Sequence, residues 1–288
     1  MIQILSPTKA YIIGHDERIE KIKEWLTYND KRVEFQITKF RANKKNFLRW
    51  QGQEKYDAHL EGLKAQRLVS LLQKDNDGYY TYSGLAAFLA DQLDTSVENK
   101  VSYPEEQIIP WDKTPPYTMY PYQAEAVEKL IACKHGGVEL ATGLGKSFIL
   151  INILKKLGLP AIVMTPSTSI SSQLFEEMTR YFGVSQVGQF FDGKKQFKKR
   201  FVVANGQSLT RMEPDSEAYQ HLSKYPVFIS DESHCTPAST FEKVCTGVAA
   251  SAPYRFFFSA TQLRNDGSDL LLKGITGPMV MSMDLAKG

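Results

Sequence analysis

The chain has 288 residues, of which 42% are hydrophobic and 23% are charged, and its formal net charge is +3. This composition is ordinary for globular proteins and excludes a largely disordered or fibrous chain, and the length suffices for two domains. No apolar stretch approaches the ~18 residues of a membrane span, and the sequence opens on no signal peptide. We therefore expect a soluble cytoplasmic protein without a membrane partner. The three cysteines lack the spacing of a zinc site, and so small a net charge does not by itself indicate nucleic acid.

The first hundred residues predict a small mixed α/β domain. Residues 16–26 carry apolar side chains at the spacing of one helix face, whereas residues 33–37 alternate as a strand does. Two further helical patterns cover residues 56–72 and 85–93. We expect residues 1–103 to form an accessory domain that is a candidate for DNA binding.

A proline-rich stretch separates this region from the rest of the chain. Five of the 13 prolines fall between residues 104 and 121. Because proline fixes φ and has no backbone N–H, this density disfavours helix and sheet and predicts a stiff linker. We place the linker at residues 104–120 and a second domain at residues 121–288.

The second domain shows an alternation of strand and helix patterns. Short apolar runs predict buried strands at residues 138–140, 161–164, 201–204, 227–229 and 256–258. Helical patterns cover residues 122–133, 146–157, 169–182 and 240–245. This alternation predicts an α/β fold with a mainly parallel sheet covered by helices on both faces.

Residues 141–147, Ala-Thr-Gly-Leu-Gly-Lys-Ser, follow a predicted strand and precede an apolar helix. In such a loop, glycines let backbone N–H groups approach phosphates, Lys146 can reach the outer phosphates, and the Ser147 hydroxyl can bind magnesium. The strict phosphate-loop pattern is not met, because Leu140 stands where its first glycine belongs. An ordinary strand-to-helix turn is the alternative for this motif alone. The candidate nucleotide-binding residues are Thr142, Gly143, Leu144, Gly145, Lys146 and Ser147.

A second motif, Asp-Glu-Ser-His at residues 231–234, follows directly on a predicted buried strand. Parallel α/β sheets bind ligands at the carboxyl ends of their strands, so two acidic side chains there suit nucleotide chemistry. Asp231 would hold magnesium, and Glu232 would deprotonate the water that attacks the γ-phosphate. A capped helix start explains Asp231 alone but not its pairing with a Gly-Lys-Ser loop. We predict Lys146, Asp231 and Glu232 as catalytic residues, with Ser147 and Asp231 at the magnesium ion.

Four further short sequences accompany these motifs. They are Tyr-Pro-Tyr-Gln at residues 120–123, Val-Met-Thr-Pro-Ser at 163–167, Ala-Asn-Gly-Gln-Ser-Leu at 204–209 and Ser-Ala-Thr at 259–261. Together, over about residues 117–270, the motifs resemble the first RecA-like domain of a superfamily-two helicase or translocase of the DExH group. Gln262 departs from the family, which usually has proline there.

The resemblance implies a RecA-like fold, ATP as the nucleotide and Mg²⁺ as its partner ion. It assigns adenine recognition to Tyr122 and Gln123, backbone contacts with nucleic acid to Thr165, Ser167 and Gln207, and coupling between the two sites to His234, Ser259 and Thr261. Motors of this family close a second RecA-like domain over the nucleotide, and too few residues follow Thr261 to form one. We therefore expect a fragment without the second motor lobe, weakly active or inactive as an ATP hydrolase alone.

Basic residues gather in two segments. Residues 31–50 contain seven basic residues and one acidic residue, with aromatic side chains interleaved. Lysine and arginine can neutralise phosphates while exposed rings stack on bases, but a solvated face over an aromatic core explains the same pattern. The second segment, residues 194–200, is predicted to be a solvated hairpin tip. The candidate DNA-binding residues in the first segment are Lys39, Arg41, Lys44 and Lys45.

A small α/β domain, a linker and this motor resemble phage recombination helicases of the UvsW type and the XPB-like branch of the superfamily. The resemblance implies an ATP-dependent helicase or translocase that acts on duplex, forked or branched DNA. The implied process is recombination with branch migration, repair or replication-fork processing. If the protein is phage-encoded, it would work in the host cytoplasm. Three alternatives stay open: an RNA helicase, the motor subunit of a restriction enzyme, and a DNA-binding clamp that does not hydrolyse ATP. Oligomeric state is not predicted.

Overall fold

The computed structural model describes residues 1–260 and 269–283 and contains two large sheets and a two-stranded ribbon. The first large sheet has the strand order β5-β6-β2-β1-β7, and the helix α4 (Ala86–Leu93) packs on it through Leu89 and Leu93. Its strands are β1 (Ile2–Ser6), β2 (Lys9–Ile12), β5 (Gln73–Asp75), β6 (Gly78–Tyr82) and β7 (Val97–Asn99). No helix in the described part of the chain is long and apolar enough to cross a membrane.

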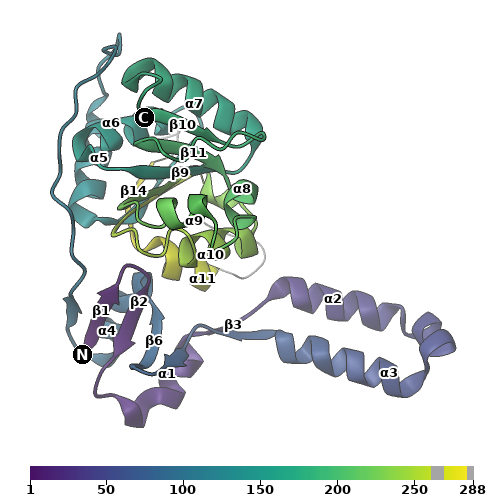
Figure 1. Ribbon diagram of the computed structural model, residues 1–288. Helices are drawn as coiled ribbons and strands as arrows, with labels where there is room; N and C mark the ends of the chain where they lie inside the picture. The colour runs from purple at the N-terminus through teal and green to yellow at the C-terminus, as the bar shows by residue number, and fades with distance from the viewer. Residues whose placement is uncertain (261–268, 284–288) are drawn as a thin grey trace.

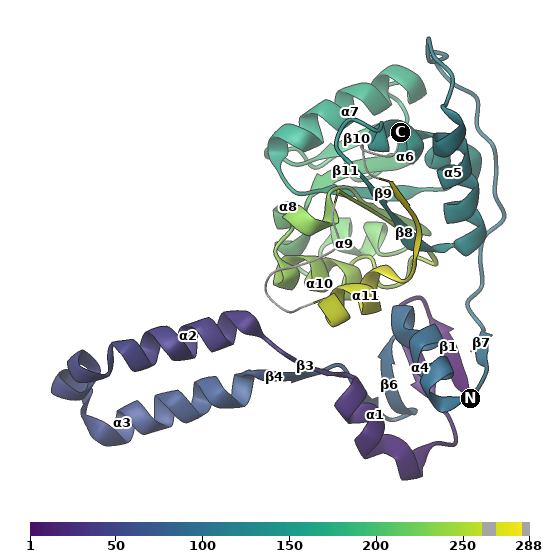
Figure 2. The ribbon, with the colours of Figure 1, turned by 180° about the vertical axis from the view of Figure 1, so that it is seen from behind.

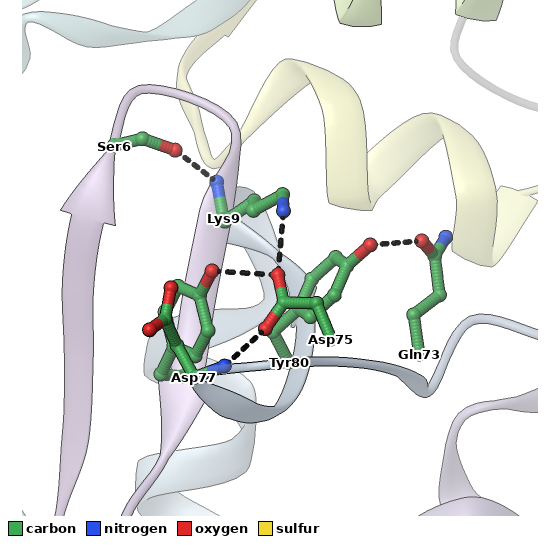
Figure 3. A network of polar contacts seen from close by, with 7 residues as sticks. Ser6, Lys9, Gln73, Asp75, Asp77 and Tyr80 are labelled. Carbon is green, nitrogen blue, oxygen red and sulfur yellow. Dashed lines mark hydrogen bonds and ion pairs between the residues drawn. The ribbon is translucent and has the colours of Figure 1, made fainter.

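A polar network ties three strands of this sheet together. Asp75 accepts hydrogen bonds from Lys9 Nζ at 2.8 Å and from the Tyr11 hydroxyl at 2.9 Å, and the Tyr80 hydroxyl donates to Gln73 Oε1 at 2.6 Å (Figure 3). The Lys9 ammonium also lies 4.1 Å from the centre of the Tyr80 ring. These contacts fix the β5–β6 hairpin against β2.

A helical hairpin projects from this region. After the 3-10 turn η1 (Asp16–Arg18) and the helix α1 (Ile19–Trp25), β3 (Thr27–Asn29) pairs with β4 (Leu68–Ser70) and forms the base of the hairpin. The helices α2 (Lys31–Ala42) and α3 (Lys44–Gln66) extend from this base, away from the rest of the molecule, and α3 is kinked at Gly52, whose φ is +81° (Figures 1 and 2).

The predicted strand at residues 33–37 is wrong, because these residues belong to α2. Asp30 starts the helix by accepting a hydrogen bond from the backbone N–H of Arg32 at 2.8 Å. Val33 and Ile37 are also four residues apart, so they share one helix face, while Phe35 is 68% exposed on another. The helix predicted over residues 56–72 likewise ends earlier, at Gln66.

The second large sheet has seven strands, and all of its neighbouring pairs are parallel. The order is β10-β11-β9-β12-β13-β8-β14. The strands are β8 (His135–Leu140), β9 (Ala161–Thr165), β10 (Val187–Phe190), β11 (Phe201–Asn205), β12 (Val227–Ser230), β13 (Tyr254–Ser259) and β14 (Met279–Met283). The predicted strands and their parallel arrangement are confirmed, and β10 and β14 are additional.

Helices cover both faces of this sheet, as predicted. On one face lie α5 (Pro121–Cys133), α6 (Lys146–Leu157) and α7 (Thr168–Phe182); towards the other lie α8 (Gly206–Thr210), α9 (Glu217–Leu222), α10 (Ala238–Thr246) and α11 (Asp269–Thr276) (Figure 1). Side chains of β9 point alternately to the two faces of the sheet, and both faces are apolar. Val163 packs in the core below α6 and α7, whereas Ile162 and Met164 pack in the core on the opposite side.

Two connections differ from simple loops. Residues 104–120 form no helix or strand but run along α6 and α7, where the backbone N–H groups of Gln107 and Asp112 donate to the carbonyls of Leu157 and Tyr181. Residues 191–200 are not the predicted hairpin tip, because they join β10 to β11, which are parallel neighbours. Such a segment must return the chain to the opposite edge of the sheet.

Candidate nucleotide site

The loop between β8 and α6 is shaped by two glycines. Gly143 and Gly145 adopt φ of +92° and +72°, which side chains rarely allow. A Cβ atom at Gly145 would also lie 2.4 Å from Nε2 of Gln123. Glycine at this position therefore lets the loop turn and lets α5 approach it closely.

Lys146 begins α6 and is only 8% exposed. Its ammonium donates a hydrogen bond to the Leu140 carbonyl at 3.0 Å and pairs with Glu232 Oε1 at 3.1 Å. The loop and the acidic motif, which are far apart in the sequence, thus meet at one edge of the sheet.

Asp231 and Glu232 follow the end of β12. The backbone N–H of Asp231 donates to the Met164 carbonyl at 2.8 Å, which anchors the motif to β9, and the Asp231 side chain is 5% exposed. Burial, followed by the neighbouring charge of Glu232, raises the pKa of Asp231 to about 6, while Lys146 acts in the opposite direction. Glu232 has φ of +47°, a conformation that strains a residue with a side chain.

The acidic motif is also tied to the neighbouring strand. The Ser233 hydroxyl donates to the Phe258 carbonyl at 2.9 Å, next to Ser259, which is 6% exposed at the end of β13. His234 belongs to the 3-10 helix η3 (Ser233–Cys235). Thr261 lies outside the described residues, so the coupling roles of His234, Ser259 and Thr261 stay predictions.

Two pockets open on either side of the phosphate-loop candidate and share Gly143, Gly145 and Ser147. The pocket of about 380 Å³ is lined by Thr142, Lys146, Ile170, Gln173, Leu174, Asp231 and Glu232 in addition to the shared residues. The pocket of about 540 Å³ is lined by Tyr117, Thr118, Tyr120, Tyr122, Gln123, Phe148 and Glu177 in addition to the shared residues. Both volumes are in the range of small-molecule sites.

The predicted adenine residues line the larger pocket and brace the loop. The Tyr122 hydroxyl and the Gln123 side-chain N–H both donate to the Leu144 carbonyl, at 3.1 Å and 3.2 Å. Gln123 Oε1 accepts from the backbone N–H of Tyr120 at 3.0 Å, and the Tyr120 and Tyr122 rings are nearly parallel, with centroids 5.8 Å apart.

Sequence reasoning missed several side chains that line the larger pocket, among them Tyr117 and Glu177. Tyr117 reaches it because its ring packs on Phe148 and its hydroxyl is hydrogen-bonded to that of Tyr181 at 3.0 Å. Glu177 comes from α7, and burial raises the pKa of its carboxyl. The aromatic cluster upstream of Gln123 was a usable signal for Tyr117, but no sequence pattern brings α7 to this pocket.

The predicted nucleic-acid contacts of the motor divide by exposure. Thr165 is fully buried, and its hydroxyl is hydrogen-bonded to that of Ser171 at 2.5 Å, so its contact with a strand stays a prediction. Ser167 is exposed and caps α7 by accepting from the backbone N–H of Ile170. Gln207 is exposed on α8.

The predicted contacts of the hairpin all lie near its tip. Lys39, Arg41, Lys44 and Lys45 are exposed around the turn between α2 and α3, remote from the nucleotide site (Figure 1). The interleaved aromatic residues have two different environments. Phe40 stacks on Tyr56 at 4.8 Å and meets Phe47 at 5.0 Å inside the hairpin, whereas Trp50 is 78% exposed.

Comparisons with known proteins agree with this geometry. The family model described as "Type III restriction enzyme, res subunit" matches residues 116–264. The "DNA 3'-5' translocase XPB2" of Sulfurisphaera tokodaii is 27% identical over 230 residues, 78% of this chain and 47% of that protein. "UvrABC system protein B" of Nitrosomonas europaea is 28% identical over 107 residues, 35% of this chain and 15% of that protein. The chain thus spans at most about half the length of these relatives.

Among solved structures, the "UvsW helicase from Bacteriophage T4" is similar over 97% of this chain and 98% of that chain, with a TM-score of 0.72 and 12% identity. At this identity the likeness shows the fold alone. It extends over the accessory region as well as the motor.

Proposed function

Because the chain belongs to the family of the type III restriction enzyme res subunit and carries a RecA-like lobe of a superfamily-two helicase, we propose that it works as an ATP-dependent DNA helicase or translocase. The observation that carries this proposal is the meeting of Lys146 and Glu232, 3.1 Å apart, beside Asp231 in a pocket that also contains Ser147. These side chains supply a phosphate-binding cation, a base and magnesium ligands in one place.

The residues fit a triphosphate with its magnesium ion. In the structure Lys146 already has a carbonyl and a carboxylate as partners, so an entering phosphate competes with Glu232 for the ammonium. Release from Lys146 leaves Glu232 able to accept a proton from the attacking water. Ser147 and Asp231 would hold Mg²⁺, which neutralises phosphate charge when it is bound.

DNA is the proposed partner. The basic tip of the hairpin supplies Lys39, Arg41, Lys44 and Lys45 for phosphates, and Trp50 presents an open ring for an unpaired base. Ser167 and Gln207 offer polar contacts on the motor, and Thr165 supports Ser167 from inside, since its hydroxyl lies 3.4 Å from the Ser167 carbonyl. The basic side chains and the exposed Trp50 ring lie on the same hairpin. Because the former suit duplex phosphates and the latter suits an unpaired base, together they favour forked or branched DNA over uniform duplex.

The finer proposal is a role in recombination, repair or fork processing, in the cytoplasm with the DNA. It is supported by the architecture shared with the phage helicase over the whole described chain. We also propose that the complete catalytic site is composite and includes groups from a second RecA-like lobe outside these residues.

One set of variants tests the function. In the complete motor, Lys146→Ala should abolish ATP hydrolysis, and Glu232→Gln should preserve ATP binding but stall hydrolysis. Glu176→Gln, an exposed acid on α7, and Lys129→Ala, an exposed lysine on α5, are the matched controls and should hydrolyse normally. Rates are measured by phosphate release, and nucleotide binding by calorimetry.

Competition between fork DNA and a fork of RNA separates the alternatives. Stronger binding and stimulation by DNA support the proposal, and a preference for RNA contradicts it. DNA binding that is indifferent to ATP and to Lys146→Ala would instead indicate a clamp.

A further inference from the structure

The basic run at residues 194–200 contains five basic side chains with different environments. Lys198 pairs with Glu217 at 2.5 Å, and Arg200 donates to the Gly158 carbonyl at 3.1 Å. The stem of Lys199 packs so closely on Gly188 that a Cβ there would lie 2.9 Å from Lys199 Cγ. These three residues therefore serve the local structure. The two that are left are Lys194 and Lys195.

Lys194 and Lys195 are exposed, and their ammonium groups have no hydrogen bond or ion pair with any residue that the structure describes. The turn that carries them is nevertheless well defined. Asp192 and Gly193 adopt φ of +51° and +73°, and the backbone N–H of Lys194 donates to the Phe191 carbonyl at 3.0 Å.

Gln189 and Gln196 close the base of this turn. The backbone N–H of Gln196 donates to the Gln189 carbonyl at 3.0 Å, and the Gln196 side chain accepts from the Gln189 backbone N–H at 3.1 Å. The two lysines thus lie in an exposed loop, as expected from the sequence, and a hydrogen-bonded turn presents them.

The register of the sheet places this turn beside the proposed DNA contacts of the motor. Phe190 at the end of β10 lies opposite Ala204 of β11, and Ala204 lies opposite Met164 of β9. The segments that follow these three strand ends carry Lys194 and Lys195, then Gln207, then Ser167. Parallel strands end at one edge, so the three segments form a row along it.

We propose that Lys194 and Lys195 bind backbone phosphates of duplex DNA and extend the contact row of the motor to the edge strand β10. The inference rests on the proposed DNA-dependent function and adds two contacts to it. Polar side chains at Ser167 and Gln207 can position a backbone but neutralise no charge. Lys194 and Lys195 supply these positive charges. Asp192 is an exposed acidic residue of the same turn, so the two lysines leave the turn with a net positive charge.

The test compares two double variants of equal charge change. Lys194→Ala with Lys195→Ala removes the proposed contacts. Lys113→Ala with Lys224→Ala removes two exposed lysines from the opposite edge of the sheet, since Lys113 neighbours the end of α7 and Lys224 precedes β12. Binding of a fluorescent 30-base-pair duplex is measured by anisotropy at several salt concentrations.

Each lost phosphate contact lowers the slope of log K against log salt by about 0.9. The Lys194/Lys195 variant should therefore lose up to about 1.8 units of slope, with an unchanged melting temperature, and the control variant should keep the wild-type slope. Lys194→Arg with Lys195→Arg should restore the slope, because the charges are retained.

A Lys194/Lys195 variant with the wild-type slope overturns the inference. If the hairpin variant that lacks Lys39, Arg41, Lys44 and Lys45 loses slope in the same assay, the proposed function stands and only this inference fails. If the wild-type protein shows no salt-dependent DNA binding, both the proposed function and this inference are contradicted.

Discussion

Glu232, which follows the end of β12, has a left-handed backbone conformation. Its φ of +47° and ψ of +48° cost a residue with a side chain about 1 kcal/mol or more. Three contacts hold the strained motif: Asp231 to the Met164 carbonyl, Ser233 to the Phe258 carbonyl, and Glu232 to Lys146. The strain is therefore maintained by β9, β13 and α6 together and aims the carboxylate at the phosphate loop.

The raised pKa of Asp231 predicts a pH-dependent effect on stability. The folded chain holds this proton up to about pH 6, and the unfolded chain releases it near 3.8, so the ionised carboxylate destabilises the fold above pH 6. This cost disappears as the pH falls towards 4. Asp231→Asn should stabilise the protein at pH 7.5 by up to about 3 kcal/mol and have little effect at pH 4.

Thermal unfolding at pH 4, 5.5 and 7.5 measures this difference between variant and wild type. Asp192→Asn is the control, because it is exposed and its left-handed backbone also suits asparagine. A stabilisation by Asp231→Asn that is equally large at pH 4 would contradict the assignment.

At the level of elements, the two halves of the chain differ in how well the sequence predicts them. Uninterrupted apolar runs predicted β9, β11, β12 and β13, because parallel strands are buried on both faces. β10 was missed since its Gly-Gln pair interrupts the pattern. In the hairpin, residues 33–37 fit both periods, and only the Asp30 cap and the partner helix decide for helix.

The candidate site shows the same division. Lys146, Asp231 and Glu232 belong to contiguous motifs at strand ends, so the sequence places them at one edge without knowledge of packing. Glu177 and the buried state of Thr165 depend on how α7 packs, which no local pattern contains.

The aromatic side chains of the α2–α3 hairpin predict two different effects of substitution, one on stability and one on DNA binding. Phe47→Ala should destabilise α2 and α3 by about 1 to 3 kcal/mol, less than a fully buried phenylalanine, because Phe47 packs on Phe40 and Tyr56. Trp50→Ala should leave stability unchanged but weaken junction and single-strand binding by about 1 to 3 kcal/mol. Hydrogen exchange of the hairpin and anisotropy with a fork separate these effects, and a stability loss in Trp50→Ala would disprove the stacking role.

The junction between the accessory region and the motor predicts acid sensitivity. Burial and then the charge of Arg255 lower the pKa of His135 to about 3, and its Nε2 is hydrogen-bonded to the Ile275 carbonyl at 2.9 Å. The unfolded chain takes up this proton near pH 6.5 and the folded chain does not, so stability falls below pH 6.5 by up to about 1.4 kcal/mol per pH unit.

His135→Gln should remove this acid loss, measured as the difference in unfolding free energy between pH 7 and pH 5. His59→Gln is the control and should keep it, because His59 is exposed on α3 although its ring lies 4.5 Å from that of Phe40. Equal acid sensitivity of wild type and His135→Gln would show that another group is responsible.

At the scale of the whole molecule, the accessory sheet is docked on the motor rather than tethered to it. The Tyr82 hydroxyl donates to Glu242 of α10 at 2.5 Å, and Gly84 approaches α11 so closely that a Cβ would lie 2.5 Å from the Lys273 carbonyl oxygen. Linker residues 104–120 add a second connection along α6 and α7.

The composite-site proposal predicts slow turnover by this chain alone. Among the described residues no arginine lines either candidate pocket, and Lys146 is the one cationic side chain in their lining. An arginine finger contributes about 10³- to 10⁵-fold in kcat. We expect the 288-residue chain to bind ATP but to hydrolyse it at least about 10³-fold more slowly than a complete motor, with little DNA stimulation, in a phosphate-release assay. Rapid DNA-stimulated turnover would contradict the composite site.

The position of β8 has a consequence for the order in which the protein folds. This strand, which leads into the phosphate loop, is paired on both sides with strands that are synthesised much later, β13 and β14. During translation β8 therefore stays unpaired while β9 to β12 are synthesised. Pairing between strands so far apart in the sequence is also slow to form. Nucleotide binding should accordingly be among the last properties that a nascent or refolding chain acquires, after most of its helices have formed.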